Sequence, residues 1–117
     1  IYGTNHKTKD GTCIRDYIHV TDIADIHHKV LEKISKTNES NILNCGYAKG
    51  VSVNEAINEF KKHSNKRLKI LKLPKRPGDM VKITANNNNL KKFIKWKPKY
   101  NRLKTIVESC IQWEKNN

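Results

Sequence analysis

Polar and apolar residues alternate over several short stretches of the chain, and strict alternation is the pattern of a half-buried strand. The alternation predicts strands over residues 16–20, 41–45 and 67–73, the second of them ended by Gly46. Between 74 and 78, two prolines and a glycine exclude regular strand pairing, so this stretch is expected to be a loop. The predicted strands are therefore few and short.

Elsewhere the apolar residues recur every three or four positions, which is the spacing of one face of a helix. This spacing predicts a helix over residues 22–34, behind a cap at 21–22, and another over 103–114. Residues 52–55 have the pattern of a capping box and start a helix that runs to about His63. The positions expected to be buried are Ile23, Ile26, Val30, Leu31 and Ile34, then Val53, Ala56, Ile57 and Phe60, and finally Leu103, Ile106, Val107, Cys110 and Ile111.

A run of four asparagines at 86–89 suits a turn and a helix cap, and Pro98 is expected to end the helix that follows. Together these elements describe a small mixed α/β unit, because the strands are too few and too short for a doubly wound fold. A chain of 117 residues fits a single domain that covers residues 1–117.

The chain opens with an apolar pair and a glycine at residues 1–3, where a free amino terminus is more often polar. We interpret it as a piece that begins inside a fold. No stretch approaches the ~20 apolar residues that a membrane-spanning helix needs. We therefore expect a soluble, cytoplasmic protein with no membrane partner.

The formal net charge of +13 raises the question of a nucleic-acid partner. Twenty of the 24 basic residues are lysines, spread along the whole chain, and only four are arginines. Lys, Asn and Ile together fill 47 of the 117 positions, which indicates biased codon composition rather than a selected binding face. We therefore expect no nucleic-acid binding.

The cysteines and the paired histidines give no sign of a metal site or a disulfide framework. Cys13, Cys45 and Cys110 are widely and unequally spaced, and we expect them to be small buried thiols. His27 and His28 are adjacent on a predicted helix, so their side chains point about 100° apart and do not converge on one ion.

For several other residues that could have a functional role, we expect a structural role instead. Asp16 is expected to pair with an arginine or to cap the next helix, and Tyr17 to lie in the core. His19 is expected to be a hydrogen-bonded structural histidine. Trp96 and Trp113 are expected to be core or interface anchors.

Four blocks of sequence carry a resemblance to a known family. They are IYG at 1–3, DGTCIRDYIHVTDIADIH at 10–27, KRPGD at 75–79 and IKWKPKY at 94–100. In this order and spacing they resemble UDP-glucose (UDP-galactose) 4-epimerases, which are members of the extended short-chain dehydrogenase/reductase family. The second block is the most specific, and the resemblance covers essentially all 117 residues.

The resemblance implies a fold and an activity. The chain would be the carboxy-terminal, UDP-sugar-binding part of an enzyme that interconverts UDP-glucose and UDP-galactose through an NAD-dependent 4-keto intermediate. Its fold would be a small mixed α/β substrate-binding lobe without the Rossmann core. The substrate would be a UDP-hexose, and the full-length protein would be a homodimer.

The resemblance also assigns site residues, each with a structural alternative. Arg15 and Arg76 would bind the diphosphate, because guanidinium groups match phosphate oxygens bidentately; both could instead be surface arginines in ion pairs. Asp79 would accept hydrogen bonds from ribose hydroxyls, or would stabilise a turn. Tyr2 would lie beside the uracil ring, or would only pack. Ile83 would lie near the hexose and limit its size, or would belong to the core.

The redox machinery of the family is expected outside this chain. No G-x-x-G-x-x-G loop follows a strand here, so NAD is assigned to a missing domain upstream of Ile1, together with the catalytic Tyr-x-x-x-Lys pair. No catalytic residue and no metal ligand are expected in the chain, and alone it is expected to be inactive.

Two other functions stay open at this point. The same lobe could belong to a 4-epimerase that acts on UDP-N-acetylglucosamine or on a UDP-pentose. From another class, the chain could be a non-catalytic basic domain that binds nucleic acid.

Overall fold

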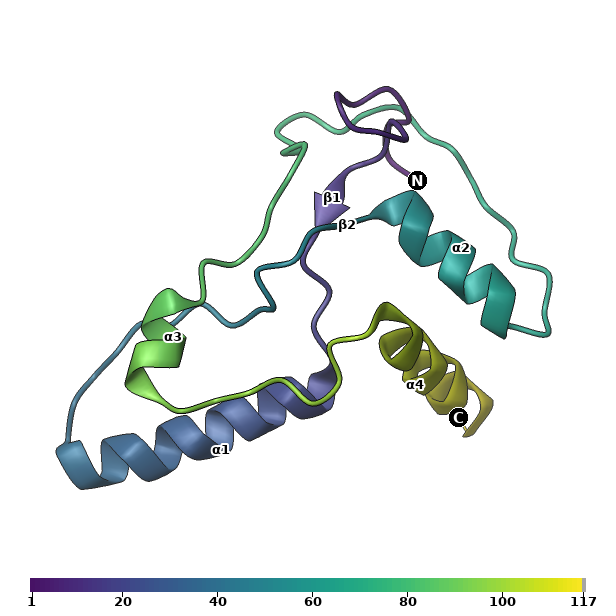
Figure 1. Ribbon diagram of the computed structural model, residues 1–117. Helices are drawn as coiled ribbons and strands as arrows, with labels where there is room; N and C mark the ends of the chain where they lie inside the picture. The colour runs from purple at the N-terminus through teal and green to yellow at the C-terminus, as the bar shows by residue number, and fades with distance from the viewer. Residues whose placement is uncertain (117) are drawn as a thin grey trace.

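The computed structural model describes residues 1–116 and is a small mixed unit of helices and strands (Figure 1). This confirms the small mixed α/β unit that was expected from the sequence. The elements follow one another as β1 (Ile14–Arg15), α1 (Val20–Thr37), β2 (Val51–Ser52), α2 (Val53–His63), α3 (Asn88–Phe93) and α4 (Leu103–Asn116).

Strand pairing is confined to short contacts. Strands β1 and β2 pair antiparallel, with Ile14 opposite Ser52 and Arg15 opposite Val51. Two isolated parallel bridges add to this pair, one between Tyr2 and Leu73 and one between Ile14 and Lys82. These contacts hold the first 15 residues beside the segment that follows residue 70.

The predicted strands at 16–20, 41–45 and 67–73 are wrong as assigned. Residues 16–19 are irregular and α1 already begins at Val20, because His19 is the helix cap and its Nδ1 accepts the N–H of Thr21 at 3.1 Å. Residues 41–45 and most of 67–73 form no ladder with other described residues. A strand requires a neighbouring strand, and alternation alone does not supply one.

The helices are predicted more closely than the strands. The capping box at the start of α2 is confirmed, since Ser52 Oγ accepts the Glu55 N–H at 3.0 Å and Glu55 Oε2 accepts the Ser52 N–H at 2.7 Å. Helix α4 begins at Leu103, as expected. Helix α3 ends at Phe93, five residues before the proline that was expected to end it.

The main core lies between α1 and α3. Ile26, Leu90, Ile94 and Trp96 are buried together, and the Trp96 ring stacks on the Tyr47 ring with 6.3 Å between the centroids. A second contact joins α2 to α4, which run side by side in Figure 1, with the buried Val107 on α4. Ile26, Trp96 and Val107 are core residues that the sequence predicted.

Some residues that were expected to be buried are exposed. Leu31 is 62% exposed, and Cys110 and Trp113 on α4 are exposed as well. Of the three cysteines only Cys13 is fully buried, whereas Cys45 is half-buried and Cys110 is exposed. The prediction that Leu31, Cys45 and Cys110 are buried is therefore wrong. Within residues 1–116, part of the apolar surface of α1 and α4 is left uncovered.

Asp22 has a different role from the cap predicted for it. Its carboxylate is fully buried and accepts the Tyr47 hydroxyl at 2.6 Å. It also accepts the backbone N–H groups of Lys99 at 3.1 Å and Tyr100 at 3.0 Å. The start of α1 is thus tied to two segments that are 25 and 78 residues away in sequence.

No helix of residues 1–116 is long and apolar enough to cross a membrane.

Candidate functional site

The structure brings together four of the five predicted site residues. Arg76 forms a bidentate pair with Asp79, with Nε to Oδ2 at 2.9 Å and Nη2 to Oδ1 at 3.0 Å. Arg15 Nη2 lies 3.9 Å from the same Asp79 Oδ1. The Arg76 guanidinium carbon lies 4.3 Å from the centroid of the Tyr2 ring. We call Tyr2, Arg15, Arg76 and Asp79 the arginine cluster.

Turn chemistry places Arg76 next to Asp79. Pro77 fixes the backbone at the second position of the turn, and Gly78 at the third has a φ of 80°, a combination typical of a type II turn. The N–H of Asp79 bonds to the carbonyl of Arg76 at 3.3 Å and closes the turn. The loop predicted from the sequence therefore fixes both charged residues of the cluster.

Strand β1 holds the third charged residue in place. The Ile14 N–H donates to the Val81 carbonyl at 2.9 Å, and the Ile83 N–H donates to the Ile14 carbonyl at 3.0 Å. Arg15 Nη1 itself donates to the carbonyls of Ile14 at 2.8 Å and Met80 at 2.9 Å. These bonds aim the Arg15 guanidinium toward the turn that carries Asp79.

The amino-terminal residues bring the aromatic ring to the cluster. The Gly3 N–H donates to the Leu73 carbonyl at 2.9 Å, and the Leu73 N–H donates to the Ile1 carbonyl at 2.8 Å. Tyr2 is thereby fixed close to the start of the loop that carries Arg76. Its ring face meets a guanidinium, which is a favourable cation–π arrangement.

The charges of the cluster are mutually stabilised. The hydrogen bond with Asp79 raises the pKa of Arg76, and the hydrogen bond with Arg76 lowers the pKa of Asp79, so both groups are ionised at neutral pH. Two arginines and one aspartate leave a net charge of +1. The Arg76 side chain is 57% exposed and commits two of its five N–H groups to Asp79, so it can still bind an anion.

Asp79 is engaged more fully than the sequence predicted. Both carboxylate oxygens already accept from Arg76. An ionised carboxylate has about four lone-pair sites, so two of them can still accept hydroxyl groups.

Ile83 lies beside the cluster and not inside it. The residue is 46% exposed, so it does not belong to the core. It lines a depression of about 400 Å³ together with Arg15, Asn44, Thr84 and Asn86. Because Arg15 belongs both to the depression and to the arginine cluster, all five predicted site residues form one continuous region.

Asp16 builds the frame of this depression, and the prediction of an arginine pair or a helix cap for it is wrong. Its carboxylate accepts three backbone N–H groups, from Tyr47 at 3.1 Å, Ala48 at 2.9 Å and Ala85 at 3.1 Å. Ala48 is held at a φ of 58°, which is unusual for alanine. No sequence pattern marks an aspartate that binds backbone groups more than 30 and nearly 70 residues away.

The sequence does contain one Tyr-x-x-x-Lys spacing, at Tyr100 and Lys104. Two such residues face each other only when one helix carries both. Tyr100 precedes α4, and its ring stacks on His19 with 4.7 Å between the centroids. Lys104 Nζ instead lies 3.8 Å from a carboxylate oxygen of Glu108. The structure therefore does not bring this tyrosine and lysine together as a catalytic pair.

The described residues do not fit an NAD site. Among residues 1–116 no helix follows a strand through a glycine-rich turn. The amino-terminal N–H groups of α1 and α2 are capped by His19 and by the Ser52–Glu55 box. In the same part of the chain no group of three or more His, Cys, Asp or Glu side chains is placed to hold a metal ion.

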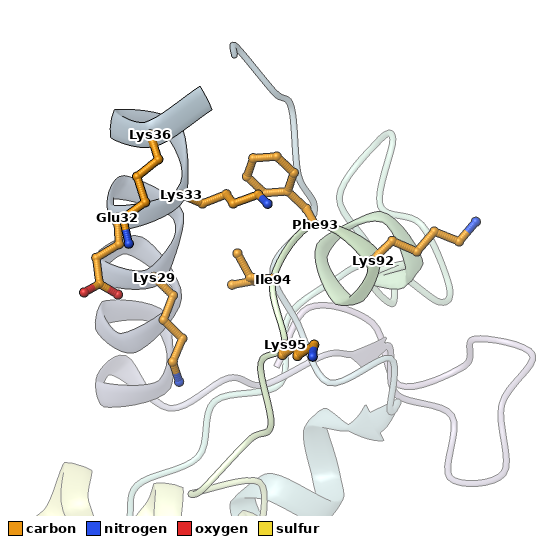
Figure 2. A pocket seen from close by; sticks show the side chains of 8 residues that line it. All are labelled: Lys29, Glu32, Lys33, Lys36, Lys92, Phe93, Ile94 and Lys95. Carbon is orange, nitrogen blue, oxygen red and sulfur yellow. The ribbon is translucent and has the colours of Figure 1, made fainter. Parts of the chain in front are cut away.

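A second pocket, of about 440 Å³, lies between α1 and α3 and is rich in lysine (Figure 2). Phe93 and Ile94 lie between the two helices, and Lys92 extends away from α1. Lys29 is paired with Asp25 at 2.7 Å. The pocket contains no predicted site residue and no arginine.

A family model and individual proteins of known type match this chain. Residues 3–46 match the NAD dependent epimerase/dehydratase family. The chain is 39% identical over 116 residues to a UDP-glucose 4-epimerase of Azospirillum brasilense, covering 99% of this chain and 33% of that relative. It is 41% identical over 115 residues to UDP-arabinose 4-epimerase 1 of Arabidopsis thaliana, covering 98% of this chain and 27% of that relative.

A solved structure shows the same arrangement of elements. The UDP-Glc/GlcNAc 4-epimerase of Campylobacter jejuni aligns with the whole chain at 42% identity and a TM-score of 0.87, and the match covers 35% of that structure. The chain thus spans about a third of the length of the relatives it matches.

Proposed function

We propose that this chain belongs to the NAD-dependent epimerase/dehydratase family, whose model matches residues 3–46, and that it is the carboxy-terminal, UDP-sugar-binding part of a UDP-glucose 4-epimerase. The whole protein would interconvert UDP-glucose and UDP-galactose in galactose metabolism, in the cytoplasm and as a homodimer. The observation that carries the proposal is the arginine cluster, because it joins two guanidinium groups and an aromatic ring that are up to 74 residues apart in sequence.

We assign to each residue of the site a role in binding the substrate. Arg15 and Arg76 bind the diphosphate, whose two negative charges suit a cluster of net charge +1. Asp79 fixes the direction of the Arg76 guanidinium and accepts from the ribose hydroxyls with its remaining lone pairs. Tyr2 lies beside the uracil, and Ile83 beside the sugar.

The chemistry itself is assigned to the remainder of the protein. NAD supplies the oxidation and reduction at the sugar carbon in this family, and residues 1–116 do not form a site that fits it. What this chain contributes is a fixed anchor for the nucleotide, which leaves the sugar end of the substrate less constrained. The chain alone is therefore proposed to be inactive.

The arginine cluster makes a direct prediction about nucleotide affinity. In the protein at its natural length, Arg15→Ala and Arg76→Ala are each expected to weaken UDP binding by about tenfold to 100-fold, because each removes charge-assisted hydrogen bonds to phosphate. Isothermal titration calorimetry measures the change. Arg67→Ala is the matched control, since Arg67 is exposed and lies outside the cluster.

Wild-type UDP affinity in both cluster variants would remove these arginines from the site. Salt-sensitive binding to random duplex DNA, in the absence of UDP binding, would favour the nucleic-acid function instead.

A second candidate substrate class is supported by the relatives and by Ile83. The relatives named above include enzymes that act on UDP-arabinose and on UDP-Glc/GlcNAc. Ile83 is half-exposed beside the depression and is smaller than a tyrosine, so a larger or a smaller sugar could fit there. Discrimination by apolar shape alone is weak, which favours activity on more than one UDP-sugar.

Ile83→Tyr is expected to suppress the N-acetylated substrate selectively. Its larger side chain would fill space that an acetamido group needs, so kcat/KM for UDP-N-acetylglucosamine should fall about tenfold relative to kcat/KM for UDP-glucose. Steady-state kinetics with both sugars measures the ratio, and Lys82→Tyr is the neighbouring control. An equal loss on both sugars would mean that Ile83 contributes to packing and not to selection.

A further inference from the structure

A buried histidine beside the arginine cluster has no part in the binding described so far. His6 is only 7% exposed, and its ring Nε2 lies 3.4 Å from the carbonyl oxygen of Tyr2. Because a carbonyl oxygen only accepts, Nε2 is a protonated ring nitrogen and donates to Tyr2. Within residues 1–116 this carbonyl is the only hydrogen-bond partner of the ring.

Gly3 lets the His6 ring approach the backbone of the amino-terminal segment. It has a φ of 78°, which residues with a side chain rarely adopt. A Cβ atom at Gly3 would come less than 3.0 Å from Nε2 of His6 and from Cγ of Lys75. The backbone of Gly3 is therefore enclosed between the His6 ring and the Lys75 side chain.

Lys75 joins this packing to the residue that would bind phosphate. Its Nζ donates to the carbonyl of Asn5 at 3.0 Å, so the amino-terminal loop is tied to the segment between α2 and α3 (Figure 1). Lys75 immediately precedes Arg76, whose guanidinium lies over the Tyr2 ring. A shift of the His6 ring would therefore reach Tyr2 through its carbonyl and Arg76 through the Lys75 side chain.

The loop that carries His6 is itself closed by hydrogen bonds. The His6 N–H donates to the Gly11 carbonyl at 2.9 Å, and the Thr8 N–H donates to the His6 carbonyl at 2.8 Å. Thr8 Oγ1 also donates to the Thr12 carbonyl at 2.8 Å. Both backbone groups of His6 are thus bonded, so its ring extends from a fixed backbone.

His6 also lies close enough to Asp79 to act on its charge. The pKa of Asp79 is lowered above all by the hydrogen bond from Arg76, and positive charge on Arg15 and His6 lowers it further. His6 is therefore near two of the four residues of the arginine cluster. It lies between the first two blocks of the family resemblance and belongs to neither, so the sequence did not mark it.

We propose that His6 is a positioning residue of the nucleotide site. Its Nε2–H group holds the Tyr2 carbonyl and its ring supports Gly3, so that the Tyr2 ring stays on the Arg76 guanidinium. Without this hydrogen bond Tyr2 would be ordered only when the nucleotide binds, and that ordering costs affinity. The inference rests on the proposed function, since it assumes that the arginine cluster binds UDP.

Two substitutions at His6 separate the hydrogen bond from packing. In the protein at its natural length, His6→Leu removes the donor at a similar size and is expected to weaken UDP binding about tenfold. His6→Gln keeps an N–H group and is expected to stay within about threefold of wild type. Isothermal titration calorimetry measures both. His28→Leu is the matched control, because His28 is exposed on α1 and pairs only with Glu32.

The steady-state constants give a readout that a general loss of structure would not produce. Because the chemistry is assigned to the remainder of the protein, His6→Leu is expected to raise KM for UDP-glucose and to leave kcat unchanged. A lower kcat with an unchanged KM would mean that less of the variant is folded, and would overturn the positioning role.

A measurement on the unsubstituted protein does not depend on how the variants fold. Nitrogen NMR of the His6 ring in mildly alkaline buffer is expected to show a proton on Nε2, and a proton on Nδ1 alone would overturn the proposal. Equal losses of UDP affinity in His6→Leu and His6→Gln would assign the ring to packing and would also overturn it.

Arg76→Ala separates this inference from the proposed function. If Arg76→Ala loses UDP affinity while His6→Leu keeps it, His6 is not a positioning residue and the proposed function stands. If Arg76→Ala keeps wild-type affinity, the proposed site fails and the role of His6 fails with it.

Discussion

Replacing Asp22 with alanine is expected to lower the free energy of unfolding by about 3–4 kcal/mol. Hydrogen bonds to a charged group contribute about 1.5–3 kcal/mol each and three are lost together, but the substitution also removes the cost of burying the carboxylate, which offsets part of this loss. The carboxylate is fully buried and accepts from the Tyr47 hydroxyl and from the N–H groups of Lys99 and Tyr100. Without it, three donors remain in a site that water does not reach. Urea denaturation followed by tryptophan fluorescence measures the loss.

The contribution of Asp22 also depends on pH in a defined direction. Burial raises its pKa, but the hydrogen bonds from Tyr47, Lys99 and Tyr100 outweigh burial, so the pKa of Asp22 lies below its ordinary value. The stabilisation is therefore present above the unfolded-state pKa of about 3.9 and is lost as the pH falls through the lower folded-state pKa. The difference between wild type and Asp22→Ala should shrink over this acid range.

Asp25→Ala is the matched control, because Asp25 lies on the same helix and forms only a surface pair with Lys29. It is expected to change the stability little. If Asp22→Ala and Asp25→Ala were equally stable at neutral pH, the buried network would not hold the start of α1.

Leu90→Ala is expected to destabilise the protein by about 3 kcal/mol, within the ~2–5 kcal/mol typical of such core truncations. Leu90 has no exposed surface and packs with Ile26, Ile94 and Trp96, so a smaller side chain leaves a cavity at the centre of the main core. The cost is expected to be large because α3 is only six residues long and has no side-chain cap.

Lys91→Ala tests whether the loss of stability in Leu90→Ala comes from the core or from a change in helix α3 itself. Lys91 is the next residue on α3 and is exposed, so its replacement is expected to leave the urea midpoint nearly unchanged. Equal midpoints for Leu90→Ala and Lys91→Ala would show that α3 is not part of the cooperative core.

The features that the sequence predicts well are those decided by neighbouring residues. The capping box of α2 needs only residues 52–55, and the turn that joins Arg76 to Asp79 needs only Pro77 and Gly78 between them. In both cases the hydrogen-bond partners are three residues apart. The resemblance assigns Arg76 and Asp79 of this turn to the substrate site, and that assignment stays a prediction.

The features that the sequence does not predict depend on distant partners. The alternation at 41–45 is real, since Leu43 faces the core and Ile42 faces outward, but no described strand pairs with it. Asp22 has the type and position of a helix cap, yet it binds groups up to 78 residues away. The cap is instead His19, which has an extended backbone and whose ring nitrogen accepts the N–H of Thr21.

The pairing of Asp79 with both arginines bears on how quickly a nucleotide could leave the proposed site. Asp79 carries the same sign of charge as a phosphate and occupies two of the five N–H groups of Arg76. A diphosphate at the proposed site would therefore meet only the three remaining N–H groups of Arg76, with a like charge close by. Both effects would lower the affinity and so raise the rate of dissociation. Product release is the step that limits turnover in many enzymes, so the same pair that fixes Arg76 would also favour turnover.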